Sequence, residues 1–243
     1  MNSIIAFLKE QKINILYYII GFLVLGFAVN IMKASTMGNG AWDTVTINAR
    51  DYLNQIIGIP WVTMGMVSFT VSFIIMSIII SYRRKIRYLF MLLPMVLVAL
   101  SIDFWNFVVF YDREASMLVY QIIFFVIGMF LLPLGLTLIV KSYFPAFVFD
   151  ELMLMFVKIT KAKKITYVRL TIEIIGITVG GIFGYLTYYH VDGSFGAVDI
   201  GSFILAIVLS PIMTFYFHIL KIKKEKPDNI ETNNKISKEK TNV

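Results

Sequence analysis

The chain has 243 residues, of which 58% are hydrophobic and 15% are charged, and its formal net charge is +7. Soluble domains carry nearer one quarter charged residues, so this composition excludes a soluble domain and predicts an integral membrane protein. The absence of cysteine excludes a disulfide framework and a thiolate metal site, and the distant His190 and His218 form no metal-ligand motif. We therefore expect no metal and no cofactor. The positive charge lies in a lysine-rich tail and in loops beside apolar runs, where it indicates membrane topology rather than nucleic-acid binding.

Six apolar stretches are each about as long as a bilayer is thick, so each is predicted to cross the membrane as a helix. The first stretch has no small-residue cleavage site after it, so we expect it to remain as a span. Pro60 is expected to open the second span, because proline is favourable at a first helical position. The predicted spans are residues 13–32, 60–81, 88–110, 118–140, 166–189 and 199–220.

Two short segments interrupt this pattern, one after the first span and one after the fourth. Residues 37–43 read Met-Gly-Asn-Gly-Ala-Trp-Asp, and residues 144–150 read Phe-Pro-Ala-Phe-Val-Phe-Asp. Each is followed by a predicted helix too short to span, 42–57 and 150–160, of which the first is amphipathic and the second almost wholly apolar. Broken backbone inside a membrane is tolerated only where it is buried in protein or lines a water-filled cavity. We expect either re-entrant half-helices that wall a site or interfacial helices.

Basic residues predict the orientation of the chain. With the amino terminus inside, the inner segments hold 2, 4, 5 and 7 of the 22 lysines and arginines, whereas the outer side holds three. Both termini are therefore expected to be cytoplasmic. Each half reads as a span, an insert and two further spans, so the second half enters the membrane from the opposite side, as in the inverted-topology repeats of secondary transporters.

The sequence thus predicts an all-α membrane protein of six transmembrane helices in two inverted three-helix repeats, each with a short half-helix or interfacial helix after its first span. The expected divisions are a cytoplasmic amino terminus (1–12), a first repeat (13–110), an outer loop (111–117), a second repeat (118–220) and a disordered cytoplasmic tail (221–243).

Several short motifs resemble those of the YczE/YyaS/YitT-type bacterial integral membrane proteins, over roughly residues 13–220. The resemblance implies a bacterial plasma-membrane protein, but that group has no settled biochemical activity. Two places depart from its pattern: Pro145-Ala146-Phe147 replaces a glycine-rich entry, and Phe90-Met91 replaces a Gly-Thr pair. The matching motifs are Gly38-Asn39-Gly40-Ala41-Trp42-Asp43, Ser101-Ile102-Asp103-Phe104, Val168-Arg169-Leu170-Thr171-Ile172-Glu173 and Gly201-Ser202-Phe203 through Ser210-Pro211.

Charged residues inside the predicted spans and inserts are the candidate binding groups, because each is costly in hydrocarbon unless it is paired or functional. Asp43 and Asp150 could bind a solute or an ion, although capping of their helices is the favoured alternative. Arg169 and Glu173 lie four residues apart and could either neutralise one another or gate and couple protons. The hypothetical substrate- or ion-binding set is Gly38, Gly40, Asp43, Asp103, Asp150, Arg169 and Glu173.

Two further assignments concern single side chains. Asp103 has no obvious local partner, so it is either functional or bonded to Trp105, Asn106 or the backbone of the opposing half. Trp42, Trp61 and Trp105 fall toward the predicted outer side, where an aromatic belt would explain them.

The leading functional hypothesis is a small-solute permease of unknown substrate. The alternative is a non-transporting membrane protein that supports a partner complex or an envelope or lipid process. An intramembrane enzyme is weakly indicated, because it would need a Ser/His pair, an Asp pair on facing spans or a metal cluster, and both histidines fall near the ends of spans. The expected partners are the lipid bilayer and an unknown small solute, with no nucleic acid. A homo-oligomer is one option, and the sequence does not decide the oligomeric state.

Overall fold

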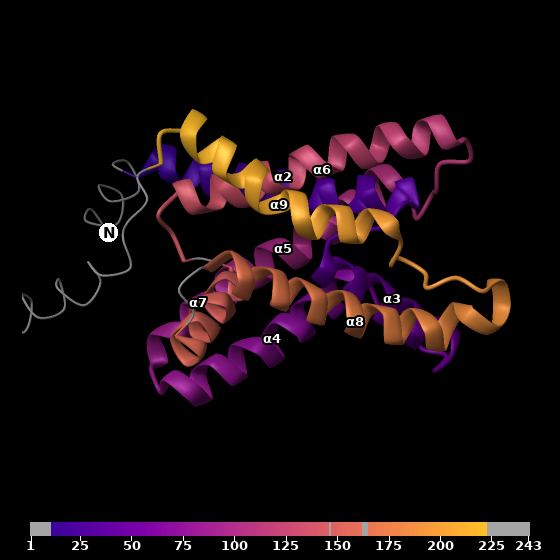
Figure 1. Cartoon of the computed structure of the whole chain (residues 1–243), viewed down its shortest axis with the longest axis horizontal. Helices are drawn as coiled ribbons and strands as arrows, with labels where there is room; N and C mark the ends of the chain where they lie inside the picture. Colours follow the sequence, from indigo (N-terminus) through magenta and orange to yellow (C-terminus); the bar gives the residue numbers. More distant parts are fainter. Residues whose placement is uncertain (1–10, 146, 162–164, 223–243) are drawn as a thin grey trace, which may run out of the picture.

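The computed structural model describes residues 11–145, 147–161 and 165–222 (Figure 1). Within these residues the chain is all α-helical without any strand, and six helices are long and apolar enough to cross a membrane. The predicted all-α fold class with six candidate spans is thereby confirmed. Most of the expected amino-terminal segment and of the expected tail lies outside the described residues.

The long helices alternate in direction along the bundle, and two short helices follow the first and the fourth of them (Figure 1). The third span is irregular at both ends, since a 3₁₀ turn (Ile86–Met91) precedes α5 and a π turn (Asn106–Phe110) follows it. The long helices are α2 (Lys12–Ser35), α4 (Met64–Arg83), α5 (Leu92–Trp105), α6 (Leu118–Lys141), α8 (Ile165–Asp192) and α9 (Ile200–Ile219), and the short ones are α3 (Ala41–Gln55) and α7 (Val148–Thr160).

The second span begins later than its proline suggested. Pro60 lies in a turn, and α4 starts at Met64 after Thr63, whose side chain accepts a hydrogen bond from the backbone N–H of Met66 at 3.1 Å. The threonine hydroxyl satisfies an otherwise free amide at the helix start, which proline cannot do.

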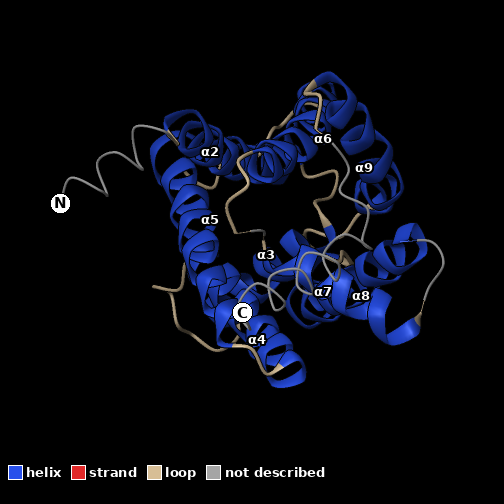
Figure 2. Ribbon diagram, turned by 90° about the vertical axis from the view of Figure 1, so that its left-hand side faces the viewer, coloured by secondary structure: helices blue, strands red, loops and turns tan. Residues whose placement is uncertain are grey.

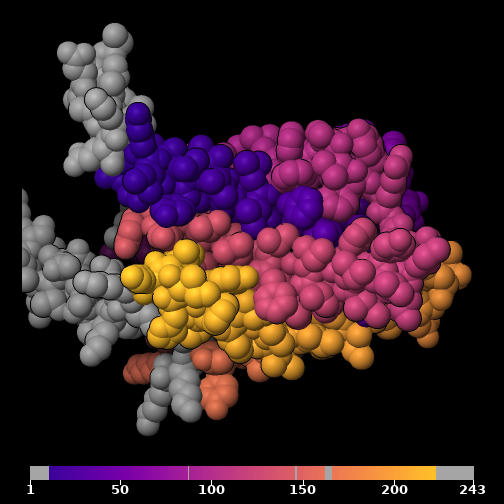
Figure 3. All heavy atoms as spheres, turned by 90° about the horizontal axis from the view of Figure 1, so that it is seen from above, coloured from indigo at the N-terminus to yellow at the C-terminus, as the bar shows by residue number. Residues whose placement is uncertain are grey.

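The two halves lie side by side when the bundle is viewed along its length (Figure 2). Helices α2, α4 and α5 form one side and α6, α8 and α9 the other, while α3 lies between them. The central contact is the antiparallel pair α2–α6, which the space-filling view shows tightly packed together with α9 (Figure 3). Glycines permit this close approach: a Cβ on Gly21 would meet Ile139 at 2.8 Å, and a Cβ on Gly128 would collide with Met32.

These two glycine contacts are equivalent under a constant shift of 107 residues, which relates Gly21 to Gly128 and Met32 to Ile139. The same shift relates the ends of α2 and α6. Ser35 Oγ donates to the carbonyl of Met32 at 2.6 Å and accepts from the N–H of Met37 at 3.3 Å. Ser142 Oγ donates to Ile139 and accepts from Phe144 at the same two distances. Helices α3 and α7 begin in this register as well, at Ala41 and Val148.

Helix α3 begins in the middle of the bundle and returns to the end at which α2 finished. Its first residue, Ala41, packs against Gly176 near the midpoint of α8, and Thr44 packs against Gly180. At its other end Arg50 binds Asp112, which also pairs with Lys33 of α2. Residues 36–55 therefore enter the bundle and return to the same end of it, and three glycines of α8 (Gly176, Gly180 and Gly184) provide the groove for them.

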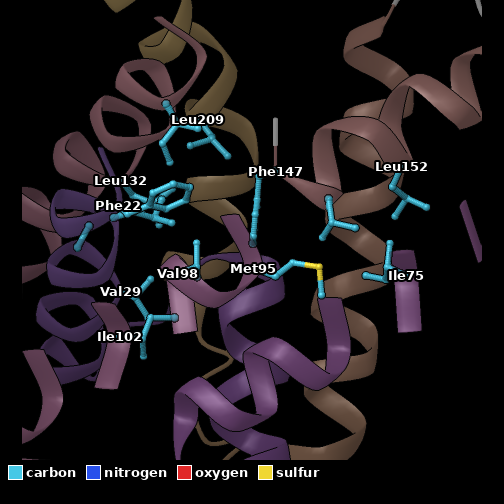
Figure 4. Close-up of a cluster of buried hydrophobic side chains, with 14 of the residues drawn as sticks. Phe22, Val29, Ile75, Met95, Val98, Ile102, Leu132, Phe147, Leu152 and Leu209 are labelled. Carbon is cyan, nitrogen blue, oxygen red and sulfur yellow. The ribbon is translucent and has the colours of Figure 1, made fainter. Parts of the chain in front are cut away.

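Helix α7 packs against α4 in the way that α3 packs against α8. Leu152 of α7 faces Ile75 of α4, and Phe147, just before α7, reaches into the bundle toward Met95 and Val98 of α5 (Figure 4). Each short helix thus packs against the middle span of the opposite half. This packing fixes the position of its first turn.

Substituting Gly26 tests how closely the spans pack. A Cβ at this position would lie 2.7 Å from the carbonyl carbon of Ser101 in α5, whereas one on Gly181 of α8 would meet nothing within 4 Å. We expect Gly26→Ala to destabilise the fold by about 1–3 kcal/mol, and Gly181→Ala to be neutral or slightly stabilising. Thermal unfolding of the two purified variants in detergent measures this, and equal melting temperatures would contradict the packing.

Candidate functional site

A cavity of about 90 Å³ lies at the centre of the bundle, where the two short helices begin. Every described helix contributes to its wall. Four of the seven predicted site residues are its charged lining, namely Asp43, Asp150, Arg169 and Glu173, and Gly40 lines it as well. A space of this size holds several water molecules or one small solute.

The two aspartates occupy equivalent places, each as the third residue of a short helix. The N-cap residue, which precedes the helix, is Gly40 in α3 and Phe147 in α7, and neither helix has a side-chain cap. The hypothesis that Asp43 and Asp150 cap their helices is therefore wrong in its strict form. Their position in the first turn still balances the partial positive charge of the helix N-terminus. No described residue donates a hydrogen bond to either carboxylate.

Gly40 makes room for one of these acids. A Cβ at this position would collide with Oδ2 of Asp43, so the carboxylate can fold back over the start of α3 only because the residue is glycine. The equivalent Phe147 instead fills the bundle interior with its ring (Figure 4). The cavity is thus bordered by a glycine at the start of α3 and by an aromatic ring at the start of α7.

Arg169 and Glu173 approach the cavity from α8. Arg169 Nε lies 3.9 Å from Glu173 Oε1, and their side chains are 18% and 13% exposed. The pair is one helical turn apart, so the guanidinium partly neutralises one carboxylate of the cavity. It leaves the other two acids without an ion-pair partner within 4 Å among the described residues.

The remaining wall is mainly apolar and aromatic. Trp42 stacks on Phe149 with ring centroids 4.5 Å apart, and these two residues are again 107 positions apart. The placement of Trp42 in an outer aromatic belt is therefore wrong: its ring packs in the interior because α3 starts there. Thr46 and Ser68 add hydroxyl groups to the lining.

Gly38 lies outside this cavity, in a polar vestibule of about 660 Å³ at the end of the bundle where α2 finishes. Its φ of +112° is a backbone conformation that favours glycine. The neighbouring Asn39 N–H donates to Ser202 Oγ at 3.1 Å, and the Gly201 N–H donates to the Met37 carbonyl at 2.9 Å. The Gly38–Gly40 segment therefore lies between the vestibule and the cavity and is bonded to α9.

Asp103 also lies away from the cavity. Its Oδ2 accepts from the Thr63 hydroxyl at 2.6 Å, and its Oδ1 accepts from the Gly65 N–H at 2.8 Å. These partners belong to the start of α4 in the same half, not to Trp105, Asn106 or the opposing half as expected. The carboxylate thus supports the N-terminus of α4, and the structure does not bring it together with the other predicted acids.

A polar network that the sequence did not single out fixes the far end of α3. Arg50 bonds Asp51 at 2.5 Å and Asp112 at 2.8 Å, and the Tyr188 hydroxyl donates to Asp51 at 2.7 Å. The signal was present in the polar face of the amphipathic helix, but the partners come from distant segments. Partial burial raises the pKa of Asp112, but the hydrogen bonds from Lys33 and Arg50 outweigh this and hold it below its ordinary value.

Comparison with protein families matches residues 12–218 to a family of unknown function, DUF6198. The match covers most of the chain, and the chain belongs to this family. No curated protein and no solved structure gives a significant match. The resemblance to the YczE/YyaS/YitT-type proteins stays a prediction, because the family match does not carry that name.

Replacing Asp103 separates a structural acid from the cavity acids. Asp103→Ala leaves the Gly65 N–H and the Thr63 hydroxyl without their acceptor, and we expect a loss of about 1–3 kcal/mol in unfolding free energy. Asp103→Asn keeps an amide oxygen for Gly65 and should retain most of the stability. Thermal unfolding in detergent distinguishes them; an equal loss in both variants would mean that the charge, not the acceptor, is what matters.

The Asp112 network predicts acid sensitivity. A carboxylate with a lowered folded-state pKa contributes stability that is present above its unfolded value, near 3.9, and is lost as the pH falls toward the folded value. We expect the melting temperature to fall on acidification below about pH 4, and to fall less in Asp112→Asn, which has already lost the charge. Parallel melting curves for the two proteins across this range would contradict the assignment.

Proposed function

We propose that this member of a family of unknown function is a permease for a small solute, with the central cavity as its binding site. The observation that carries the proposal is the meeting of two short helices inside the bundle, each with an acid of its first turn facing the cavity. Discontinuous helices whose ends face a midplane site are the arrangement by which secondary transporters bind solutes and coupling ions. Because the proposal rests on these discontinuous helices, we propose binding and transfer of a solute rather than catalysis.

We further propose that the two halves are inverted-topology repeats. The constant shift of 107 residues supports this, because it relates contacts in which each half plays both roles: Gly21 meets Ile139 as Gly128 meets Met32. A self-complementary contact of this kind is what a two-fold axis produces. Antiparallel packing of the related helices α2 and α6 requires that axis to lie across the bundle rather than along it.

The route through the protein is proposed to pass the Gly38–Gly40 segment. The polar vestibule lies on one side of this segment and the central cavity on the other. Two hydrogen bonds hold the segment against α9: the Asn39 N–H donates to the Ser202 hydroxyl, and the Gly201 N–H donates to the Met37 carbonyl. Breaking these few bonds would join the two spaces without moving a whole span.

The alternative, a non-transporting protein that supports a partner complex, predicts a bundle with no polar cavity between its halves. The charged cavity formed by the described residues favours the permease. With the basic-residue distribution, we propose a bacterial plasma-membrane protein with both termini in the cytoplasm and the vestibule open to the outside.

Single-cysteine labelling tests the topology, since the natural chain has no cysteine to be removed. We expect Arg84→Cys and Lys161→Cys to react with a membrane-impermeant maleimide only after the cells are opened. Glu114→Cys and Ser194→Cys should react in intact cells. Labelling of positions 84 and 161 from opposite sides would disprove the inverted relation of the halves.

Proteoliposome swelling tests transport. Vesicles that contain the protein are exposed to panels of small neutral, cationic and anionic solutes, and flux is followed by light scattering. For the solute that permeates, we expect Asp43→Asn and Glu173→Gln to reduce the rate at least tenfold. Asp103→Asn is the matched control and should transport normally, because its carboxylate lies outside the cavity. Protein-dependent flux for no solute in the panel would argue against a permease.

A further inference from the structure

We propose that the occupant of the central cavity is a small monovalent organic cation, of the primary or quaternary ammonium class. This inference rests on the proposed function only in that it concerns the same cavity. Its binding can be measured whether or not transport follows.

The charges of the cavity leave a place for one positive charge. Three carboxylates, Asp43, Asp150 and Glu173, face one guanidinium, that of Arg169. The N-termini of α3 and α7 each add roughly half a positive charge. With all three carboxylates ionised, the sum leaves about one negative charge unbalanced in the interior, where an uncompensated charge is costly. A monovalent cation balances it, while an anion would double it.

The aspartates are also free to bind such a cation. Neither Asp43 nor Asp150 accepts a hydrogen bond from a described residue, and both line the cavity. Arg169 lies 3.9 Å from Glu173 of its own helix, and no ion pair within 4 Å joins it to either aspartate among the described residues. The two carboxylates therefore offer unused acceptor oxygens from opposite halves of the bundle, which suits a group that carries several N–H donors or a diffuse positive charge.

The charged residues of the vestibule provide a second, independent argument for a cation. Two cationic side chains line it, Lys33 and Arg50, and both are paired with acids. Three more carboxylates line it without a salt bridge among the described residues: Glu114, Asp192 and Asp199. A cleft with an excess of one charge raises the local concentration of the opposite ion. The approach to the cavity thus selects for cations before the cavity does.

The walls of the cavity favour an organic cation over a hydrated metal ion. The stacked rings of Trp42 and Phe149 present π-electrons, which attract alkylammonium groups, and the rest of the wall is largely aliphatic. Within the described residues no group of three His, Cys, Asp or Glu side chains has the arrangement of a metal site. An alkylated ammonium ion gives up less hydration free energy on entering such a space than a metal ion does, because its charge is more diffuse.

Equilibrium binding to the full chain in detergent tests the proposal, with ¹⁴C-methylammonium and ¹⁴C-tetramethylammonium as probes. We expect saturable binding of at least one of them, weakened tenfold or more in Asp43→Asn and in Asp150→Asn. Glu151→Gln is the matched control. It removes the adjacent acid of α7, which lies 3.7 Å from Arg83 and does not line the cavity, and should bind like the natural chain.

A second measurement tests the inference if the Asp43 and Asp150 variants fail to fold. In Thr46→Cys, which keeps every charge, the probe cation should slow labelling by a small thiol reagent several-fold. Saturable binding of ¹⁴C-acetate or ¹⁴C-glycerol but of neither ammonium would overturn the inference, and so would the absence of ammonium binding. Ammonium binding without flux in proteoliposomes would overturn the permease and leave this inference standing. Flux of neutral or anionic solutes alone would support the permease and overturn this inference.

Discussion

Two helices begin inside the bundle, and each exposes there the backbone N–H groups that no earlier turn can satisfy. In a low-dielectric interior these groups and the helix dipole require a counter-charge. Asp43 and Asp150 supply it from the first turn of α3 and α7, and Gly40 and the α8 glycines allow the backbone to come close enough. The cavity, the ion pair on α8 and the polar vestibule are all arranged around this one requirement.

The fold was largely predictable because hydropathy is a strong signal: apolar runs of span length have few alternatives in a membrane. The boundary at Pro60 was missed, because a capping threonine three residues later competes with the proline. The convergence of Asp43, Asp150, Arg169 and Glu173 was foreseen as a set of intramembrane charges, but Asp103 was wrongly grouped with them. Sequence spacing could not reveal that the partners of Asp103 start the neighbouring helix, nor that Asp112 links α2 to α3.

The two halves correspond under the shift of 107 residues, but the side chains of their short helices differ in chemistry. The first short helix carries Asn48, Arg50 and Asp51 and is bonded to loops at its far end. The second is mostly apolar, and an ion pair of 3.7 Å between Glu151 and Arg83 of α4 adds to its apolar packing on that helix. Only the first is bordered by the vestibule. The end of the molecule where α2 finishes therefore carries the polar vestibule, which borders α3 and not α7.

The stacked rings of Trp42 and Phe149 have a mechanical consequence. They are in contact across the boundary between the two short helices, and each short helix packs against the middle span of the opposite half. A tilt of either half would drag its short helix along and pull the rings out of register. In the proposed permease, a movement that opened one end of the bundle would therefore also disturb the packing of the short helix that belongs to the other half.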